Sequence, residues 1–330
     1  MATELPSWNW AGSGDTAEVD GETFRFRVLG LDTDHELVVL KTAEIGHDYE
    51  QLIRRERPDR IVELGMKDGG SAALLAVAAR PEVLVGIDLG PVPERLTDLV
   101  RRRGLDGRVY AHGGVDQADR AAVLAAMEPF GDAAIDLVID DASHLLGPTV
   151  ASIEALLPRV RPGGLYLIED WCGDYLQACM TAEAIGGSGG DRSDLPERIE
   201  RIRRTIEVLN SPGATLPPEL VAALGVEHER NQREGRTADE GLGAVGLIGA
   251  IVTAMFTVDL DLLRTVPGRA SRPLSDLATI FALAASREHG PIETLHVTSN
   301  WLLVRRGGAP LDPDTFRLAD LAPDHFGYLT

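Results

Sequence analysis

The sequence has no excess of positive charge and almost no cysteine. Its 32 lysines and arginines stand against 52 aspartates and glutamates, which gives a net charge of −20. A surface that binds nucleic acid or an anionic membrane carries the opposite sign, so we expect neither as a partner. The two cysteines, Cys172 and Cys179, lack metal-ligand spacing and indicate reduced thiols in a cytoplasmic protein rather than a disulfide framework.

Long hydrophobic runs are also missing. The opening residues, MATELPSWNW, have neither a basic start nor an apolar stretch, so we expect no signal peptide. The one long uncharged run covers residues 242–258 and contains three glycines. It is shorter than the roughly 20 apolar residues of a membrane helix, so we expect a buried helix or a subunit contact there, and a homo-oligomer.

A regular alternation of short apolar runs and helical stretches begins near residue 60. This rhythm predicts a parallel sheet with helices on both faces, in which ligands bind beyond the carboxyl ends of the strands. Near the C-terminus, Ser299 and Asn300 are expected to turn one strand into an antiparallel partner. The five apolar runs are RIVEL, VLVGID, RVYAHG, IDLVID and GLYLIED, at residues 60–64, 83–88, 108–113, 135–140 and 164–170.

Four parts are predicted along the chain. Residues 1–47 form an N-terminal extension in which residues 22–42 alternate as a hairpin would. Residues 48–180 form the core that binds the cofactor and a metal. Residues 181–285 form an insertion or lid over the active site, and residues 286–330 complete the core. A merely structural cap is the alternative for the insertion.

A glycine-rich loop, VELGMKDGGSA, joins the first core strand to its helix. Gly65 and Gly69 allow a tight turn and a close backbone approach to a ligand. Glu63 would repel a pyrophosphate but suits an ammonium group. The pattern E-x-G-x-x-x-G-x-S resembles the first motif of class I S-adenosylmethionine-dependent methyltransferases. The resemblance implies that Glu63, Gly65, Gly69 and Ser71 bind S-adenosylmethionine.

Acids end the second, fourth and fifth core strands. Asp88 can accept both ribose hydroxyls of the cofactor, although it could also simply begin a loop. Asp140 and Asp141 end the fourth strand, and Glu169 and Asp170 end the fifth. Adjacent parallel strands would bring these four carboxylates to one rim, where a divalent cation would relieve their repulsion; two unrelated solvated loop ends are the alternative. All-oxygen ligands favour Mg²⁺ or Mn²⁺ over Zn²⁺.

The segments DDASH and PGGLYLIEDWCGDY resemble a narrower family. It is the metal-dependent sugar O-methyltransferases of macrolide and related antibiotic pathways, a group that includes cephalosporin hydroxylase-like and rhamnosyl O-methyltransferase proteins. The resemblance implies a Rossmann-like class I methyltransferase fold, mainly a parallel sheet with a C-terminal antiparallel hairpin. It assigns Asp140 to cofactor binding, Asp141, Glu169 and Asp170 to the metal, and His144 to the general base.

The resemblance predicts Mg²⁺- and S-adenosylmethionine-dependent O-methylation of a hydroxyl on a sugar or other polyhydroxyl natural product. The cation would stabilise the charge that develops on the acceptor, while His144 takes the hydroxyl proton. We expect a small-molecule acceptor, a glycosylated natural product, although a catechol-like acceptor would suit the same chemistry. A histidine after a strand is also often a structural hydrogen-bonder. A cephalosporin hydroxylase-like enzyme and a non-catalytic cofactor-binding scaffold subunit are the alternative functions.

Overall fold

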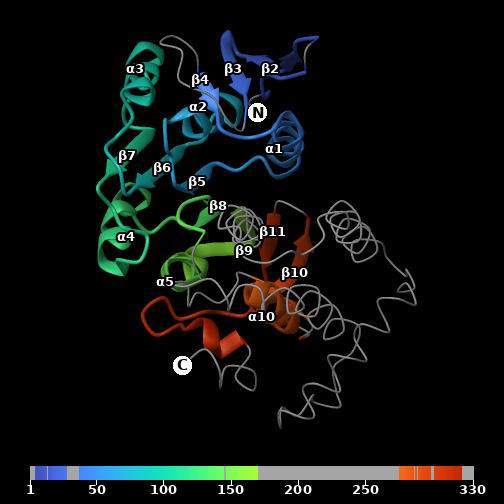
Figure 1. Ribbon diagram of the computed structural model, residues 1–330. Helices are drawn as coiled ribbons and strands as arrows, with labels where there is room; N and C mark the ends of the chain where they lie inside the picture. Colours follow the sequence, from blue (N-terminus) through green and yellow to red (C-terminus); the bar gives the residue numbers. More distant parts are fainter. Residues whose placement is uncertain are drawn as a thin grey trace, which may run out of the picture. The chain divides into compact units, whose positions relative to one another are not determined.

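The computed structural model describes residues 4–12, 14–27, 37–144, 146–169, 275–285, 287, 289–298 and 301–321. Asp170, both cysteines, the run at 242–258 and the expected insertion up to residue 274 lie outside these residues. The chain divides into two compact units (Figure 1). The first unit comprises residues 1–143 and 151–164, and the second comprises residues 144–150 and 165–330.

Short strands alternate with helices through most of the first unit, as the sequence predicts. The elements α5 and β9 continue from one unit into the other. In chain order, the strands and α-helices up to β9 are β1 (Trp8–Trp10), β2 (Thr16–Val19), β3 (Glu22–Phe26), β4 (Leu37–Val39), α1 (Ala43–Glu56), β5 (Arg60–Leu64), α2 (Gly70–Ala78), β6 (Val83–Asp88), α3 (Glu94–Arg103), β7 (Val109–Gly113), α4 (Arg120–Ala126), β8 (Ile135–Asp140), α5 (Leu146–Leu156) and β9 (Val160–Glu169).

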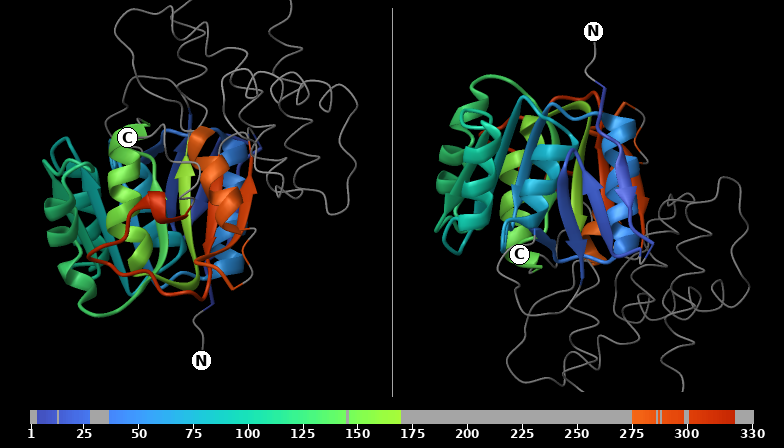
Figure 2. Two further views of the ribbon diagram at one scale, coloured as in Figure 1. Left: turned by 90° about the horizontal axis from the view of Figure 1, so that it is seen from below. Right: turned by 90° about the horizontal axis from the view of Figure 1, so that it is seen from above.

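Parallel pairing connects the central strands of the first unit. The strand β5 pairs with β6 on one side and with β8 on the other, and β6 pairs with β7, all in parallel. Residues of β5 such as Ile61, Val62 and Leu64 are fully buried, as expected for a strand that is covered on both faces. Helices lie on both faces of these strands (Figure 2). The predicted α/β fold with a mainly parallel sheet is confirmed.

The helix α1, which precedes the central strands, has a buried face and clear ends. Tyr49, Leu52 and Ile53 of α1 are buried. The Thr42 side chain caps the N-terminus by accepting a hydrogen bond from the Ile45 N–H. At the other end, Arg57 takes a left-handed conformation immediately before Pro58, which ends the helix.

The N-terminal strands form their own sheet, in the order β1-β2-β3-β4. The prediction of a hairpin across residues 22–42 is wrong, because β3 and β4 pair in parallel. The hairpin instead joins β2 to β3 through Asp20 and Gly21, both at positive φ. An Asp-Gly pair between two strands is the usual sequence of such a two-residue turn, so this hairpin was readable from the sequence.

The second unit contains the predicted C-terminal hairpin. Its described elements beyond β9 are α10 (Ser275–Ala285), β10 (Ile292–Val297) and β11 (Trp301–Arg306). β10 pairs antiparallel with β11, and β11 pairs antiparallel with the final residues of β9. Apolar side chains from these elements, among them Phe281 and Leu302, are fully buried. Among the described residues, no helix is long and apolar enough to cross a membrane.

Candidate active site

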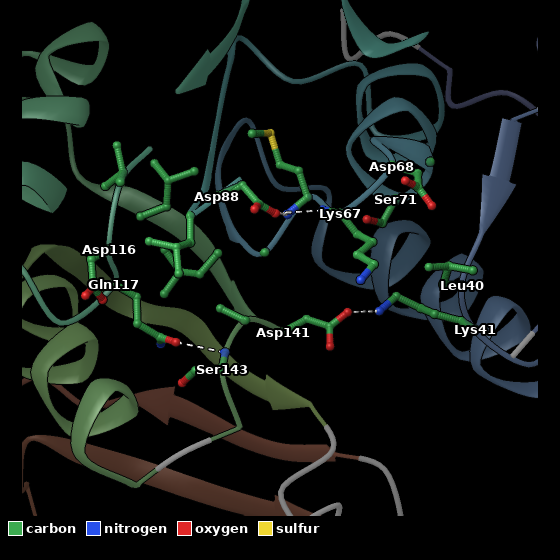
Figure 3. Close-up of a pocket in the computed structure, with 18 of the residues that line it drawn as sticks. Leu40, Lys41, Lys67, Asp68, Ser71, Asp88, Asp116, Gln117, Asp141 and Ser143 are labelled. Atoms are coloured by element: carbon green, nitrogen blue, oxygen red, sulfur yellow. Dashed lines mark hydrogen bonds and ion pairs between the residues drawn. The ribbon is translucent and has the colours of Figure 1, made fainter. Parts of the chain in front are cut away.

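A cavity of about 300 Å³ lies in the first unit, where the loops after β5, β6, β7 and β8 meet (Figure 3). The sequence predicts a site at these strand ends, and this volume is at the lower end of the range for small-molecule sites. Val38, Leu40 and Lys41, at and just beyond the end of β4, also line it. The N-terminal sheet therefore contributes to the cavity wall.

Asp88 fixes the shape of the glycine-rich loop. Its Oδ2 accepts hydrogen bonds from the backbone N–H groups of Met66 (2.8 Å) and Lys67 (2.7 Å). Its Oδ1 accepts one from the Gly90 N–H at 2.7 Å. A carboxylate has about four acceptor positions, and these amides fill three of them. Asp88 lines the cavity, but it has capacity for about one further hydroxyl rather than two.

Gly65 is required by the close approach of β8 to the start of this loop. It has a φ of +90°, and a Cβ atom there would lie 2.2 Å from the backbone oxygen of Asp141. The Asp141 N–H in turn donates to the Leu64 carbonyl at 2.9 Å. The glycine thus brings the end of β8 against the loop, so that Asp141 and the loop share one cavity.

Asp141 pairs with a lysine from the N-terminal sheet. The Lys41 ammonium lies 2.5 Å from Asp141 Oδ2, and Lys41 is buried while Asp141 is 21% exposed. The same ammonium lies 5.6 Å from the centre of the Tyr49 ring, a cation–π distance. A buried lysine needs such partners, because an isolated buried charge is strongly unfavourable.

Asp140 lies behind the cavity rather than in its lining. It is 2% exposed, and it accepts hydrogen bonds from Gln117 Nε2 (3.1 Å) and Ser152 Oγ (2.7 Å). The other end of the Gln117 amide accepts from the Ser143 N–H at 2.9 Å. Gln117 does line the cavity, so Asp140 fixes the orientation of a residue that can touch a ligand.

The charges in the lining are mainly negative. Four aspartates, Asp68, Asp88, Asp116 and Asp141, line the cavity together with two lysines, Lys41 and Lys67. Apolar side chains, including Ile87 and Val115, form other parts of the wall. A cavity of this composition attracts a ligand that combines an apolar body with positive charge.

The structure brings together four of the predicted site residues in the lining of this cavity. Gly65, Ser71, Asp88 and Asp141 line the cavity. Glu63 and Gly69 do not: Glu63 is fully buried in β5, and Gly69 precedes α2 as its N-cap with a φ of +83°.

Three further predicted residues are not part of the described first unit. His144, at a left-handed φ of +53°, and Glu169, buried at the end of β9, belong to the second unit. Asp170 lies outside the described residues. Within the described part of the chain, no group of three or more His, Cys, Asp or Glu side chains is placed to hold a metal.

Sequence reasoning missed Lys41 and Gln117. Gln117 follows the third core strand at the same edge of the sheet as Asp88, so the strand-end rule that selected Asp88 could have found it. Lys41 follows an apolar strand, but it lies in a segment that was interpreted as an extension outside the core.

Residues 62–171 match a family model described as a methyltransferase domain. The predicted resemblance to methyltransferases is thereby confirmed for this range, which contains the glycine-rich loop, Asp88 and Asp141.

Two curated relatives of this chain are named as O-methyltransferases. The mycinamicin VI 2''-O-methyltransferase of Micromonospora griseorubida is 41% identical over 199 residues, which cover 57% of this chain and 46% of the relative. The 8-demethyl-8-alpha-L-rhamnosyl tetracenomycin-C 2'-O-methyltransferase of Streptomyces olivaceus is 32% identical over 143 residues, covering 41% and 35%. The matches thus span less than half the length of these relatives.

A solved structure is also similar. It is the MycE methyltransferase from the mycinamycin biosynthetic pathway in complex with Mg and SAH, at 18% identity and a TM-score of 0.37. The match covers 84% of this chain and 51% of that one.

Proposed function

We propose that this chain is an S-adenosylmethionine-dependent O-methyltransferase that methylates a sugar hydroxyl of a natural product with the help of a divalent cation. The observation that carries the proposal is the anionic cavity of the methyltransferase domain, in which Asp88 organises the glycine-rich loop beside Asp141. The named activities of the two curated relatives support the choice of a sugar hydroxyl as the acceptor.

The cavity fits the chemistry of S-adenosylmethionine. This cofactor combines an apolar and hydrogen-bonding nucleoside with a sulfonium and an ammonium, and its net charge is positive. The lining offers aliphatic side chains together with four aspartates against two lysines. Ser71 and Asp88 would bind polar groups of the cofactor, and Gly65 would let it approach the backbone; Glu63, Gly69 and Asp140 would support this surface from behind.

The donor chemistry at Asp141 fits a hard divalent cation. Asp141 presents a carboxylate to the cavity and already holds a cationic partner there. Carboxylate oxygens are the ligands that Mg²⁺ and Mn²⁺ prefer. We assign Glu169 and Asp170 as further ligands because the segment PGGLYLIEDWCGDY resembles that of the metal-dependent sugar O-methyltransferases.

Each residue of the proposed site would then have a separate role in the reaction. Bound S-adenosylmethionine supplies an activated methyl group, and a bound cation supplies positive charge beside the acceptor oxygen. His144 would accept the proton of the acceptor hydroxyl at an imidazole nitrogen. Asp141 would hold the cation, and Gln117, oriented by Asp140, would fix the opposite wall of the cavity. Their fixed geometry would keep the hydroxyl aligned with the methyl group.

Calorimetry with S-adenosylhomocysteine and with NAD tests the cofactor assignment. We expect S-adenosylhomocysteine to bind and NAD not to, because the negative lining disfavours a pyrophosphate. Binding of NAD without any response to S-adenosylhomocysteine would refute the assignment.

Product mass tests the reaction. With S-adenosylmethionine, Mg²⁺ and a panel of glycosylated macrolide or polyketide acceptors, we expect products heavier by one methylene group. A gain of one oxygen would instead identify a hydroxylase, and cofactor binding without any product across the panel would favour a scaffold subunit. Chelation with EDTA should abolish the methylene gain and added Mg²⁺ should restore it; activity that survives EDTA would remove the metal from the proposal.

A further inference from the structure

Lysine is confined to one place in this protein. The chain contains 32 lysines and arginines, of which only Lys41 and Lys67 are lysines. Both line the cavity of the methyltransferase domain, and Figure 3 shows them on neighbouring parts of its wall. Everywhere else arginine supplies the positive charge. A lysine differs from an arginine in being a compact, flexible point charge that can exchange partners.

The two lysines are held differently. Lys41 is buried, with its ammonium 2.5 Å from Asp141 Oδ2 and facing the Tyr49 ring. Lys67 is exposed, and its backbone N–H donates a hydrogen bond to Asp88 Oδ2. The chain therefore contains a buried cavity lysine that is paired with Asp141 and a matched exposed one that is not.

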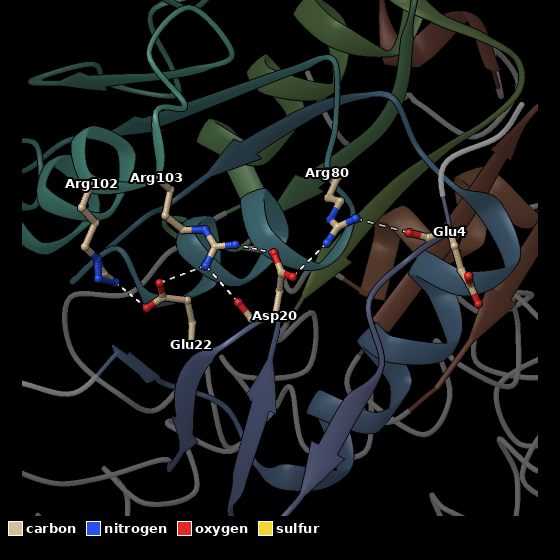
Figure 4. A network of polar contacts seen from close by, with 6 residues as sticks. All are labelled: Glu4, Asp20, Glu22, Arg80, Arg102 and Arg103. Atoms are coloured by element: carbon tan, nitrogen blue, oxygen red, sulfur yellow. Dashed lines mark hydrogen bonds and ion pairs between the residues drawn. The ribbon is translucent and has the colours of Figure 1, made fainter.

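The segment that carries Lys41 is firmly attached to the core. A Cβ atom at Gly70 would lie 1.8 Å from the Val38 carbonyl oxygen, so β4 packs directly on the start of α2. Asp20, in the β2–β3 turn, forms ion pairs with Arg80 (2.9 Å) and with Arg103 (Figure 4). The backbone at Lys41 is thus fixed, and the flexible part is the side chain.

We propose that Lys41 is an internal counter-ion for the metal position: its ammonium neutralises Asp141 until a divalent cation binds there, and cation binding displaces it. The inference rests on the proposed function, because it takes Asp141 as a metal ligand. Binding a divalent cation and an ammonium to this carboxylate at the same time is unfavourable, since two like charges within about 5 Å repel strongly in partly buried surroundings. The ammonium therefore has to move when the metal enters.

Amine acetylation of the wild-type protein tests the displacement directly. With two lysines in the chain, peptide mass spectrometry reports Lys41 and uses Lys67 as an internal control. Without metal we expect slow acetylation of Lys41 and fast acetylation of Lys67. Added Mn²⁺ should speed acetylation of Lys41 several-fold and leave Lys67 unchanged. Slow acetylation of Lys41 at saturating Mn²⁺ would overturn the proposal.

Mn²⁺ affinity of variants, measured by electron paramagnetic resonance of the free ion, gives a second readout. Lys41→Met removes a positive charge that competes with the cation for Asp141, so we expect its Mn²⁺ binding to be about tenfold tighter. Lys41→Arg keeps the charge and pairs through a more rigid fork, so it should bind Mn²⁺ no more tightly than the wild type does. Lys67→Met removes an equal but solvent-screened charge and should have a much smaller effect.

The outcomes separate this inference from the metal assignment. If the wild type binds Mn²⁺ and Lys41→Met binds it no more tightly, the counter-ion role is refuted while the metal site stands. If neither protein binds Mn²⁺, the metal assignment fails and the counter-ion role fails with it. Tight binding by Lys41→Met alone would support the proposal most strongly.

Discussion

Replacing Gly65 by alanine should damage the methyltransferase domain for two separable reasons. Its φ of +90° is unfavourable for a side chain, and a Cβ atom would lie 2.2 Å from the Asp141 carbonyl oxygen and 2.8 Å from the Ala142 Cα. The left-handed conformation costs about 1–2 kcal/mol, and forcing an extra methyl group into a packed site costs about 1–3 kcal/mol. We therefore expect Gly65→Ala to lower the free energy of unfolding by about 2–5 kcal/mol.

Gly114→Ala is the matched control. Gly114 has a φ of +74°, but nothing lies within 4 Å of a Cβ atom built there, so its substitution should cost only the conformational part, about 1–2 kcal/mol. Hydrogen exchange of the β5 and β8 amides in urea would report the unfolding of the first unit. The free energies of unfolding of the two variants should differ by the steric cost of the added methyl group. Gly65→Ala should also bind S-adenosylhomocysteine more weakly, because the Asp141 backbone moves. Equal destabilisation of the two variants would refute the close approach.

Further predictions concern the buried network, the base and the charge. Ser152→Ala removes a 2.7 Å hydrogen bond to the buried Asp140 and should destabilise the first unit by about 1–3 kcal/mol, measured by the same exchange experiment; an unchanged stability would mean that Gln117 alone suffices. His144→Ala should lower turnover by about 10²- to 10⁴-fold without changing S-adenosylhomocysteine affinity, and added Mg²⁺ should not rescue it; wild-type turnover would place the base elsewhere. With a net charge of −20, the protein should not retain RNA at physiological salt, and a salt-sensitive gel shift would contradict this.

The sequence predicted β5, β6 and β8 closely because most of their residues are buried on both faces. Runs such as RIVEL and IDLVID correspond to β5 and β8 without any change in their ends, since a continuous apolar run bounded by polar residues has few alternative pairings. The N-terminal strands are short, and the pairing of β3 with β4 is parallel across residues that give no turn signal. Periodicity alone does not specify such a partner.

Site residues that directly follow a core strand were predictable, whereas a site residue that comes from the N-terminal sheet was not. Asp88 and Asp141 follow their strands directly, so the strand-end rule finds them. The pairing of Lys41 with Asp141 joins residues 100 positions apart through a sheet that precedes the core. Nothing local in the segment LVVLK indicates that partner. The expectation that Asp140 and Asp141 share one rim was wrong, because a strand alternates its side chains between opposite faces and only Asp141 lines the cavity.

The backbone N–H groups of the glycine-rich loop have partners within the protein. In dinucleotide-binding folds the free N–H groups of such a loop bind a pyrophosphate at the start of the helix. Here the N–H groups of Met66 and Lys67 donate to Asp88, and the Gly69 N–H donates to the Met66 carbonyl. These donors are therefore used within the protein, and the cavity receives the negative charge of Asp88 in their place. The unit therefore presents negative charge to the cavity, which favours a positively charged ligand over an anion.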